Sequence, residues 1–345
     1  MVGKVLINVL NYNSHQYLER CVDSVRCQTY PNIDLRVTDN ASSEESRDYI
    51  RKHLGSVSVR FNDRNLGYAN AHNAAMAEGT FDFYMPLNPD IELEPDFVLQ
   101  LVRGIESAPD IGSANGKVYF LTRHGHRTNY LYSAGHEFDR ARRASNRGYK
   151  QLDTGAFAEP AFVFGANGAA PLYKKTFLEA VKVNGTYFDK DFFMYWEDTD
   201  IGWRGVLMGY RCLYVPSAVA HHYGFGSQGL SSRYVQYQYE KNRFITVYKN
   251  DLPTFLLADL HVILFHELFN LCFYLYSSPG RVVQYLRGIA GFILALPRKR
   301  HERREIMSRR KIDKPTLRTL YLHPWLRNLI RRRLHFKALA NGAQG

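Results

Sequence analysis

A short apolar strand followed by an amphipathic helix is repeated along the first hundred residues, and this repeat restricts the possible folds more than any other feature. Residues 4–10 form a mainly apolar run, and apolar side chains then recur with helical spacing from Leu18 to Val25. Strands that alternate with helices are joined by right-handed crossovers. We therefore predict an α/β fold with a mainly parallel, twisted sheet flanked by helices. Further strands are expected at residues 35–39, 57–61 and 81–87, and further helices at 42–54, 67–77 and 95–105.

The second helix has a recognisable start, whereas the chain beyond residue 105 is less regular. Ser42 and Glu45 have the spacing of a capping box, so Ser42 is expected to cap this helix. Loops and short antiparallel strands are expected over residues 112–150, and a strand at 212–215 is expected to end in a turn at Pro216. Later helices are predicted near 174–181, from about Asp198, and over 234–248, 253–276 and 281–296.

Polar side chains follow several of the predicted strands. In open parallel sheets, ligands bind at the carboxyl ends of the strands. These side chains are therefore expected to converge on one crevice. The clusters are Asn11-Tyr12-Asn13, Asp39-Asn40, Asn65 and Asn88-Pro89-Asp90.

The composition excludes several classes of protein. With 345 residues, of which 45% are hydrophobic, the chain can form a sizeable core and is neither a disordered tail nor a disulfide-stapled miniprotein. The four cysteines form no C-x-x-C pair, which favours buried thiols in a reducing, cytosolic compartment. The apolar run near Met1 is too short for a signal peptide and is interpreted as a strand. P-loop and zincin motifs do not occur in the sequence.

The segment Asn88-Pro89-Asp90 places a carboxylate after an apolar strand, at the edge of the sheet where a ligand is expected. Hard divalent cations such as Mg²⁺ bind carboxylate oxygens together with phosphate oxygens of a ligand. Asp90 is therefore a candidate metal ligand. The alternative is an ordinary turn before the helix that starts at about Pro95.

Three carboxylates lie within four residues in the segment Glu197-Asp198-Thr199-Asp200, directly after an aromatic run. Like charges so close together raise one another's pKa, which suits a general base. The alternative is that these carboxylates interact with the dipole of a helix that begins here. Asp200 and Arg204 are four residues apart and can form an ion pair, so Asp200 is interpreted as mainly structural.

The pair His221-His222 follows the strand predicted at 212–215. A neutral imidazole is a suitable additional ligand for a metal ion. The alternative is a histidine pair in a loop without such a role.

Taken together, these segments resemble family 2 glycosyltransferases of the GT-A fold, especially the bacterial rhamnosyltransferase-like group. The resemblance extends over residues 8–227. It implies a nucleotide-sugar-binding half at residues 1–105, an acceptor-binding and catalytic half at 106–232, and a helical, basic extension at 233–345. The matching segments are NVLNYNSHQYLERCVDSV, VTDNASSEES, NDRNLGYANAHNAA, YMPLNPDIEL, GANGAAPLYKK, FDKDFFMYWEDTDIGWR and HHYGFGS.

The resemblance also implies roles for individual residues. Asp198 matches the catalytic base of the family, which deprotonates the acceptor hydroxyl. Asp90 and His222 match positions that bind Mg²⁺ or Mn²⁺, and Glu92 is a candidate additional ligand. Trp196 and Glu197 are candidates for contact with the acceptor. The nucleotide-sugar contacts are expected from Asn11, Tyr12, Asn13, Asp39, Asn65 and Asn88, where Asn88 replaces the first carboxylate of the family's D-x-D motif.

The activity that the resemblance implies is an inverting transfer of a sugar, rhamnose among the candidates, from a nucleotide diphosphate. The acceptor is expected to be a glycan or lipid-linked glycan in cell-surface polysaccharide synthesis. One alternative is a catalytically inactive protein of the same fold that binds nucleotide sugars or acts as a scaffold. A nucleotidyltransferase is the other alternative, but residues 11–14 are not the glycine-rich, basic loop that it would need.

The positive charge of the chain is concentrated near its end. Residues 291–345 hold fifteen Lys and Arg against three Asp and Glu, which equals the whole formal net charge of +12. Peripheral contact with anionic lipids at the inner face of the cell membrane is therefore expected. The apolar segment 254–276 contains Asp259 and Glu267, which favours an interfacial or buried helix over a membrane span. Solvated helix faces are the alternative, and nucleic acid is not expected as a partner because no known binding motif accompanies the charge.

Overall fold

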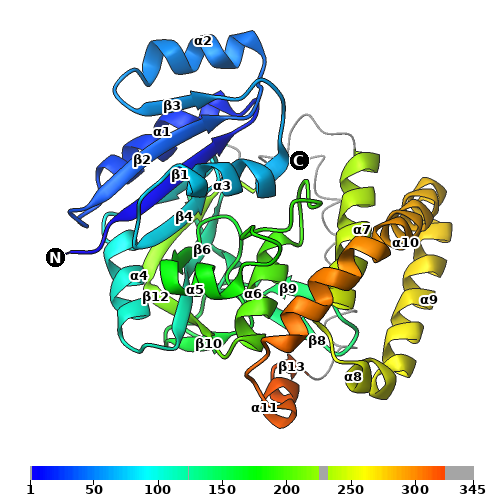
Figure 1. Ribbon diagram of the computed structural model, residues 1–345. Coiled ribbons are helices and arrows are strands. Elements are labelled where there is room, and N and C mark those ends of the chain that lie inside the picture. Colours follow the sequence, from blue (N-terminus) through cyan, green and yellow to red (C-terminus); the bar gives the residue numbers. More distant parts are fainter. Residues whose placement is uncertain (1, 123, 225–231, 323–345) are drawn as a thin grey trace.

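The computed structural model describes residues 2–122, 124–224 and 232–322, which form a mixed α/β fold with a helical C-terminal part (Figure 1). The helices and strands follow in the order β1 (Val5–Asn11), α1 (His15–Arg26), β2 (Ile33–Asp39), α2 (Glu44–His53), β3 (Ser58–Phe61), α3 (Gly67–Ala77), β4 (Phe83–Leu87), β5 (Ile91–Leu93), α4 (Phe97–Glu106), β6 (Ile111–Leu121), β7 (Arg127–Ser133), β8 (His136–Asp139), β9 (Ala144–Asn146), β10 (Ala161–Val163), β11 (Leu172–Lys174), α5 (Lys175–Val181), α6 (Glu197–Leu207), β12 (Arg211–His222), α7 (Ser232–Asn250), α8 (Pro253–Ala258), α9 (Leu260–Ser277), α10 (Pro279–Ser308), α11 (Lys314–Thr319) and β13 (Tyr321–Leu322).

One sheet contains strands from residues 1–105 and from residues 106–232. Within the described residues it has ten strands, in the order β10-β12-β6-β11-β4-β1-β2-β3, with β5 paired to β12 and β7 paired to β6. The strands β1 to β4 pair in parallel, as the repeat of strands and helices predicted. β11 lies between β4 and β6 and is antiparallel to both, so the sheet as a whole is mixed.

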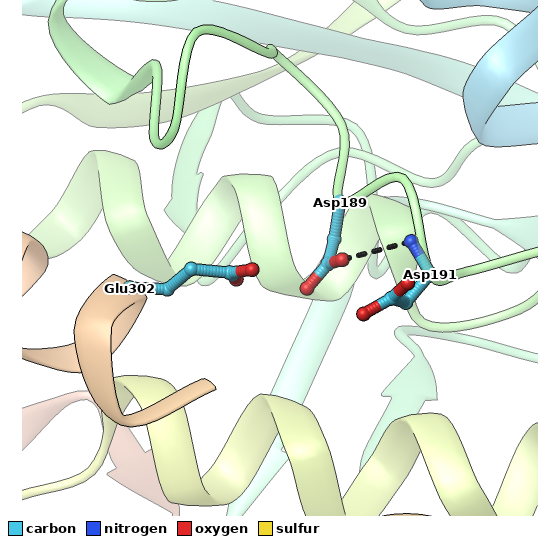
Figure 2. A group of neighbouring side chains, drawn as sticks. All are labelled: Asp189, Asp191 and Glu302. Atoms are coloured by element: carbon cyan, nitrogen blue, oxygen red, sulfur yellow. Dashed lines mark hydrogen bonds between the residues drawn. The ribbon is translucent and has the colours of Figure 1, made fainter. Parts of the chain in front are cut away.

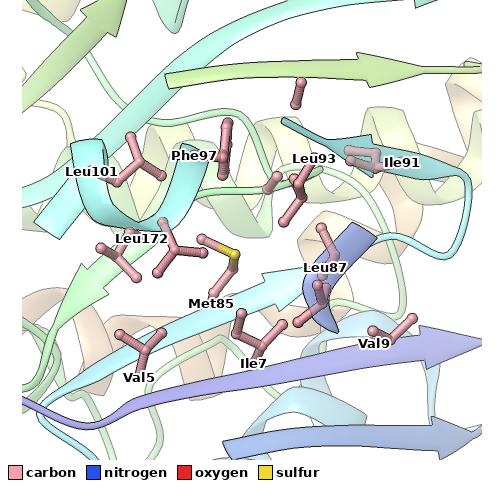
Figure 3. Close-up of a cluster of buried hydrophobic side chains, with 14 of the residues drawn as sticks. Val5, Ile7, Val9, Met85, Leu87, Ile91, Leu93, Phe97, Leu101 and Leu172 are labelled. Carbon is pink, nitrogen blue, oxygen red and sulfur yellow. The ribbon is translucent and has the colours of Figure 1, made fainter. Parts of the chain in front are cut away.

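The centre of this sheet is apolar because its strands are covered on both faces. Val5, Ile7 and Val9 of β1 pack with Met85 and Leu87 of β4 in one buried cluster (Figure 3). α4 covers this cluster with its own apolar side chains. A rigid pair of central strands therefore supports the polar residues that follow β1 and β4.

A second, more aromatic cluster joins the sheet to the helices that follow it. Phe177 of α5 and Trp203 of α6 are buried there together with Ile245 of α7 and Ile306 of α10. In Figure 1, α10 lies against α7, and α9 lies on the side of these helices away from the sheet. The C-terminal helices are thus packed onto the part of the fold that contains α6.

The start of α2 differs from the expected capping box. Ser43 is the N-cap, and its Oγ accepts a hydrogen bond from the Ser46 backbone N–H at 3.5 Å. The Ser42 Oγ instead accepts from Asn11 Nδ2 at 3.1 Å and from the Asn13 N–H at 2.9 Å. The prediction for Ser42 was wrong because its hydroxyl bonds to a loop distant in sequence.

The chain after residue 110 is also more regular than expected. Short strands occur as predicted, but the long strand β6 lies in the middle of the sheet. β12 does not end at Pro216; it continues to His222, with an irregularity in its pairing with β6 between Val215 and Val219. Proline is tolerated at such irregularities because it has no N–H to donate. His221 and His222 therefore lie on a strand that pairs with β5, not in a loop.

Candidate functional site

A cleft of about 1090 Å³ lies where β1, β2 and β4 end, in the position that the strand-end rule predicts. Small-molecule pockets usually measure roughly 300–1,000 Å³, so this cleft has room for a large ligand or for two. Most of the predicted site residues line it, although they come from distant parts of the chain. These are Tyr12, Asn65, Asn88, Asp90, Trp196, Glu197, Asp198 and His222.

Three predicted residues lie behind the wall of the cleft. Asn11 and Asp39 are fully buried, and Asn11 Nδ2 donates to Asp39 Oδ1 at 3.0 Å. The other oxygen of Asp39 accepts from Arg47 Nε at 3.1 Å. Asn13 adopts a left-handed φ of 52°, and its Oδ1 accepts from the Ser43 N–H at 2.8 Å. These side chains shape the loops after β1 and β2, and direct contact with a nucleotide stays a prediction for them.

Asn40 lines the cleft and was assigned no role from the sequence. Its Nδ2 donates to Asn65 Oδ1 at 2.8 Å, and its Oδ1 accepts from the Leu66 N–H at 2.9 Å. The signal was its place directly after β2, next to Asp39. Neutral amides therefore line this end of the cleft, where they can exchange hydrogen bonds with a polar ligand.

Asp90 and His222 meet in the cleft although 132 positions separate them. Asp90 follows β4, His222 ends β12, and His222 Nε2 lies 3.1 Å from Asp90 Oδ1. Both side chains are buried, and Tyr132 packs edge-on against the His222 ring. Neighbouring ligands of an octahedral Mg²⁺ lie about 3 Å apart, since each is about 2.1 Å from the metal. The donor set therefore fits a divalent cation whose other ligands come from phosphate and water.

The neighbours that were considered as metal ligands point elsewhere. His221 Nε2 lies 3.0 Å from Glu94 Oε1, outside the residues that line the cleft. Glu92 accepts from Tyr223 Oη at 3.3 Å and lies 3.7 Å from Arg20. Alternation along β12 explains the first case, because successive side chains on a strand face opposite sides of the sheet.

Asp189, Asp191 and Glu302 form an acidic group (Figure 2). None of these three residues lines the cleft. Lys299 Nζ lies 2.5 Å from Asp189 Oδ1 and 2.8 Å from Glu302 Oε1. Lys249 Nζ lies 2.6 Å from Asp189 Oδ2. Two buried ammonium groups are thus already paired with these carboxylates, so the group is an ion-pair network that joins α7 and α10 to the loop before α6.

Asp198 lies in the first turn of α6 with its carboxylate held in place. Oδ2 accepts from the Gly168 N–H at 2.8 Å, and Oδ1 accepts from the Thr199 N–H at 2.6 Å. A Cβ at Gly168 would come within 3.0 Å of Oδ2, so glycine leaves the space that the carboxylate occupies. His136 Nε2, which the sequence did not single out, lies 3.6 Å from Oδ2. An oriented carboxylate at the cleft wall is suited to accept a proton from a bound hydroxyl.

Trp196 and Glu197 belong to the same wall but are largely buried. Burial first, and then the charge of Asp198, raise the pKa of Glu197 well above its usual value. The expected effect of clustered carboxylates therefore falls on Glu197. Trp196 is only 4% exposed and packs against Tyr239, which leaves little of its ring for stacking with a ligand. Tyr195 and Trp196 both have left-handed φ angles, of 65° and 74°, a costly conformation that is often found at functional sites.

Asp200 has the structural role that its spacing predicted. It is fully buried, and its Oδ2 lies 2.9 Å from Arg204 and 3.2 Å from Lys249 Nζ. Asn250 Nδ2 donates to its Oδ1 at 2.8 Å. Asp200 therefore anchors α6 to α7, while Asp198 on the same turn faces the cleft.

The fold and the place of the cleft define the GT-A class: a central sheet flanked by helices, a polar cleft at the strand ends and a helical C-terminal part. Residues 7–162 match the model of the family described as Glycosyl transferase family 2.

Known proteins agree with this class. The chain is 26% identical over 211 residues to poly-β-1,6-N-acetyl-D-glucosamine synthase of Staphylococcus aureus. The aligned region covers 60% of this chain and 47% of that protein. The structure of Staphylococcus aureus TarS with UDP matches at a TM-score of 0.53 and 15% identity, over 85% of this chain and 81% of that one. The structure of the mannosyltransferase PcManGT of Pyrobaculum calidifontis, in complex with GDP-Man and Mn²⁺, matches at a TM-score of 0.51 and 16% identity. This match covers 86% of this chain and 76% of that one. The chain spans less than half of the length of the curated relatives it matches.

Proposed function

We propose that this protein is a family 2 glycosyltransferase that moves a sugar from a nucleotide diphosphate to a glycan acceptor with inversion of the anomeric centre. The observation that carries the proposal is that one cleft brings together Asp90, His222 and Asp198 from three distant segments. The family match over residues 7–162 and the nucleotide complexes of proteins with the same fold support it.

The proposed reaction is a single in-line displacement. Asp198 accepts the proton of the acceptor hydroxyl while its oxygen bonds to the anomeric carbon, and the bond from that carbon to the diphosphate oxygen breaks. Asp90 and His222 would hold Mg²⁺ or Mn²⁺, which when bound supplies positive charge for the leaving diphosphate. Asn40, Asn65 and Asn88 would bind the donor through neutral hydrogen bonds.

The substrates are part of the same proposal. Rhamnose is the first donor sugar to test, because Asn88 stands where the rhamnosyltransferase-like group often replaces the first carboxylate of the D-x-D motif. A lipid-linked glycan on the cytoplasmic side of a membrane is the proposed acceptor, in the synthesis of a cell-surface polysaccharide. Trp196 and Glu197 belong to the wall that would face this acceptor.

The test measures nucleotide release from UDP-, dTDP- and GDP-sugars with Mg²⁺ or Mn²⁺ and glycan acceptors. Asp198→Asn should lower kcat by about 10²–10⁴-fold, the usual contribution of a general base, while nucleotide binding measured by calorimetry stays intact. Glu45→Gln is the matched control, because Glu45 also lies in the first turn of a helix but is exposed and does not line the cleft.

Unchanged turnover in Asp198→Asn would remove Asp198 as the base. Nucleotide binding without turnover of any donor and acceptor pair would instead favour a binding or scaffolding protein of this fold.

A further inference from the structure

The helix α9 has its polar side buried and its apolar side exposed. His266 and Asn270 face the protein, are 5% exposed and are joined by a hydrogen bond of 2.8 Å. On the same side, Glu267 accepts from Arg243 at 2.8 and 2.9 Å. The exposed side carries large apolar residues and no Asp, Glu, Lys or Arg. Its exposed members include Leu260, Leu264, Phe265, Leu268 and Phe269.

This arrangement is the reverse of a helix on a water-facing surface, whose apolar stripe faces the core. Leu264 is 58% and Leu268 is 62% exposed, and Leu257 of α8 extends the apolar surface. An apolar surface of this kind on a soluble domain marks contact with a partner or a membrane. Among the described residues, α9 is the helix that has the length and apolar composition to cross a membrane.

α10 contacts α9 and adds both apolar and positive side chains. Leu286, Ile293 and Leu294 are 55%, 55% and 77% exposed. Both glutamates of α10 are paired: Glu302 with Lys299 of the same helix, and Glu305 with Arg309, the residue that caps its end. The exposed arginines of this helix are Arg281, Arg287, Arg298, Arg300 and Arg304.

The basic residues near the chain end, which were expected to bind lipid, are partly turned inward in the described region. Lys299 is fully buried among carboxylates. Arg309 donates to the backbone oxygen of Lys182, and Arg318 pairs with Asp259. The residues 323–345, which hold part of the predicted basic surface, lie outside the described residues. The exposed apolar face of α9 with the arginines of α10 is therefore the better candidate for membrane contact.

We propose that α9 and the adjoining exposed part of α10 form a docking face, defined by Leu260, Leu264, Leu268, Leu286 and Leu294, for an anionic lipid bilayer. The apolar side chains enter the boundary between head groups and acyl chains, and the arginines of α10 bind the head groups. The helix lies in the plane of the membrane, because the buried ion pair of Glu267 and Arg243 holds it against α7.

A second copy of the chain is disfavoured as the occupant of this face. In a two-fold dimer the same patch meets itself, so the positive charge of one patch would be brought close to the positive charge of its copy. Anionic lipid has the complementary charge. The opposite, protein-facing side of α9 is linked to the cleft: Arg143, in the turn between β8 and β9, pairs with Glu267 at 3.1 Å, and β9 lines the cleft.

Vesicle flotation tests the proposal without using the proposed enzymatic activity, so the two can fail separately. The full chain should float with vesicles of phosphatidylcholine and phosphatidylglycerol, and less with phosphatidylcholine alone. The double variant Leu264→Ser, Leu268→Ser should lower the partition constant about tenfold or more, because two apolar side chains no longer enter the acyl boundary. Leu152→Ser is the matched control, because Leu152 is 50% exposed on a different part of the protein. Absence of wild-type flotation, or equal loss in the control, would overturn the proposal.

Cys272 supplies a native probe on the exposed side of α9, in a Cys27→Ser background that removes the other exposed thiol. A polar maleimide should modify Cys272 in the lipid-free protein, and anionic vesicles should protect it. Protection without lipid that grows with protein concentration would assign the face to a second copy. Protection without lipid at every concentration would assign it to a segment of the chain itself. Either of these two results would overturn lipid docking.

Discussion

The parallel half of the sheet and the C-terminal helices are held together by different kinds of buried polar contact. In the parallel half, one buried group of four side chains from β1, β2, α3 and β4 is neutral: Thr38 Oγ1 donates to Asn8 Oδ1 at 2.8 Å, and His72 Nδ1 lies 3.1 Å from Asn8 Nδ2 and 2.7 Å from Tyr84 Oη. No carboxylate takes part in this group. The cost of burial is small for Asn8, Thr38 and Tyr84, since each is paired with a neutral partner.

The C-terminal helices are fixed instead by buried charges from distant segments. Asp259, before α9, binds Arg140, Arg142 and Arg318. Burial alone would raise the pKa of Asp189, but the charges of Lys249 and Lys299 hold it well below its usual value. The comparison shows that strand and helix periodicity can build the first region from local pattern, whereas the second depends on pairs of charges that meet only after folding.

Among the variants that test this comparison, Lys299→Met should lower the free energy of unfolding most. Methionine keeps much of the side-chain volume but leaves Glu302 and Asp189 buried with one ammonium group fewer, so unfolding free energy should fall by about 3–5 kcal/mol. Urea unfolding followed by circular dichroism measures the change. Arg298→Met is the matched control on the same helix, because its ion pair with Asp191 is exposed and should contribute less than about 1 kcal/mol. Equal effects for the two variants would show that the network does not hold α10.

Acid should weaken the neutral region first. Burial lowers the pKa of His72 to about 3, whereas in the unfolded chain it is about 6.5, so between these values the unfolded state binds the extra proton. Stability from His72 is complete above pH 6.5 and should fall by about 1.4 kcal/mol for each pH unit below it. The ion pairs act later. Burial would raise the pKa of Glu267, but the charges of Arg243 and Arg143 and the hydrogen bonds to it together lower this pKa to about 2, so its contribution is lost only below about pH 4.5.

Urea midpoints between pH 7 and pH 5, for wild type and His72→Gln, test this order. The variant is less stable at neutral pH, because Asn8 and Tyr84 lose a partner, but its midpoint should change less over this range. An identical slope in both proteins would show that another group controls the response to acid.

The same contrast explains how much of the molecule the sequence predicts. The strands up to β4 and the convergence of Asp90 on the cleft follow from local periodicity and the strand-end rule. Asp198 on α6 and His222 on β12 reach the same cleft, and their meeting was expected from the family resemblance alone. The extension of β12 past Pro216 depends on pairing with β5 and β6, which no local pattern contains.

Two other features were beyond the reach of a local pattern. From the sequence, Lys299 is interpreted as part of a basic tail, because its partner Asp189 lies 110 positions away. The polar side of α9 is visible in the sequence, but only Arg243 and Arg143 show that this side faces inward. Side chains whose partners are remote in sequence are therefore the ones that pattern alone assigns least well.

The adjacent residues Ser42 and Ser43 give the smallest test of local pattern against remote contacts. Local spacing assigns the cap of α2 to Ser42. If that assignment held, Ser42→Ala would lower stability more than Ser43→Ala, because the helix would lose its cap. In the structure Ser43 is the cap, with a long bond of 3.5 Å, so its replacement should cost only about 0.5 kcal/mol. Ser42→Ala should cost about 1–3 kcal/mol for a different reason, because it leaves Asn11 Nδ2 and the Asn13 N–H without the hydroxyl that they bond.

Hydrogen exchange at individual backbone amides distinguishes these two roles of Ser42. If Ser42 were a helix cap, Ser42→Ala would speed hydrogen exchange in the first turn of α2. If it joins the loops after β1 and β2, faster exchange should appear at the Asn13 N–H while the first turn of α2 is unchanged. The second outcome would show that a hydroxyl placed by local spacing at a helix start is used by a contact 29 positions away.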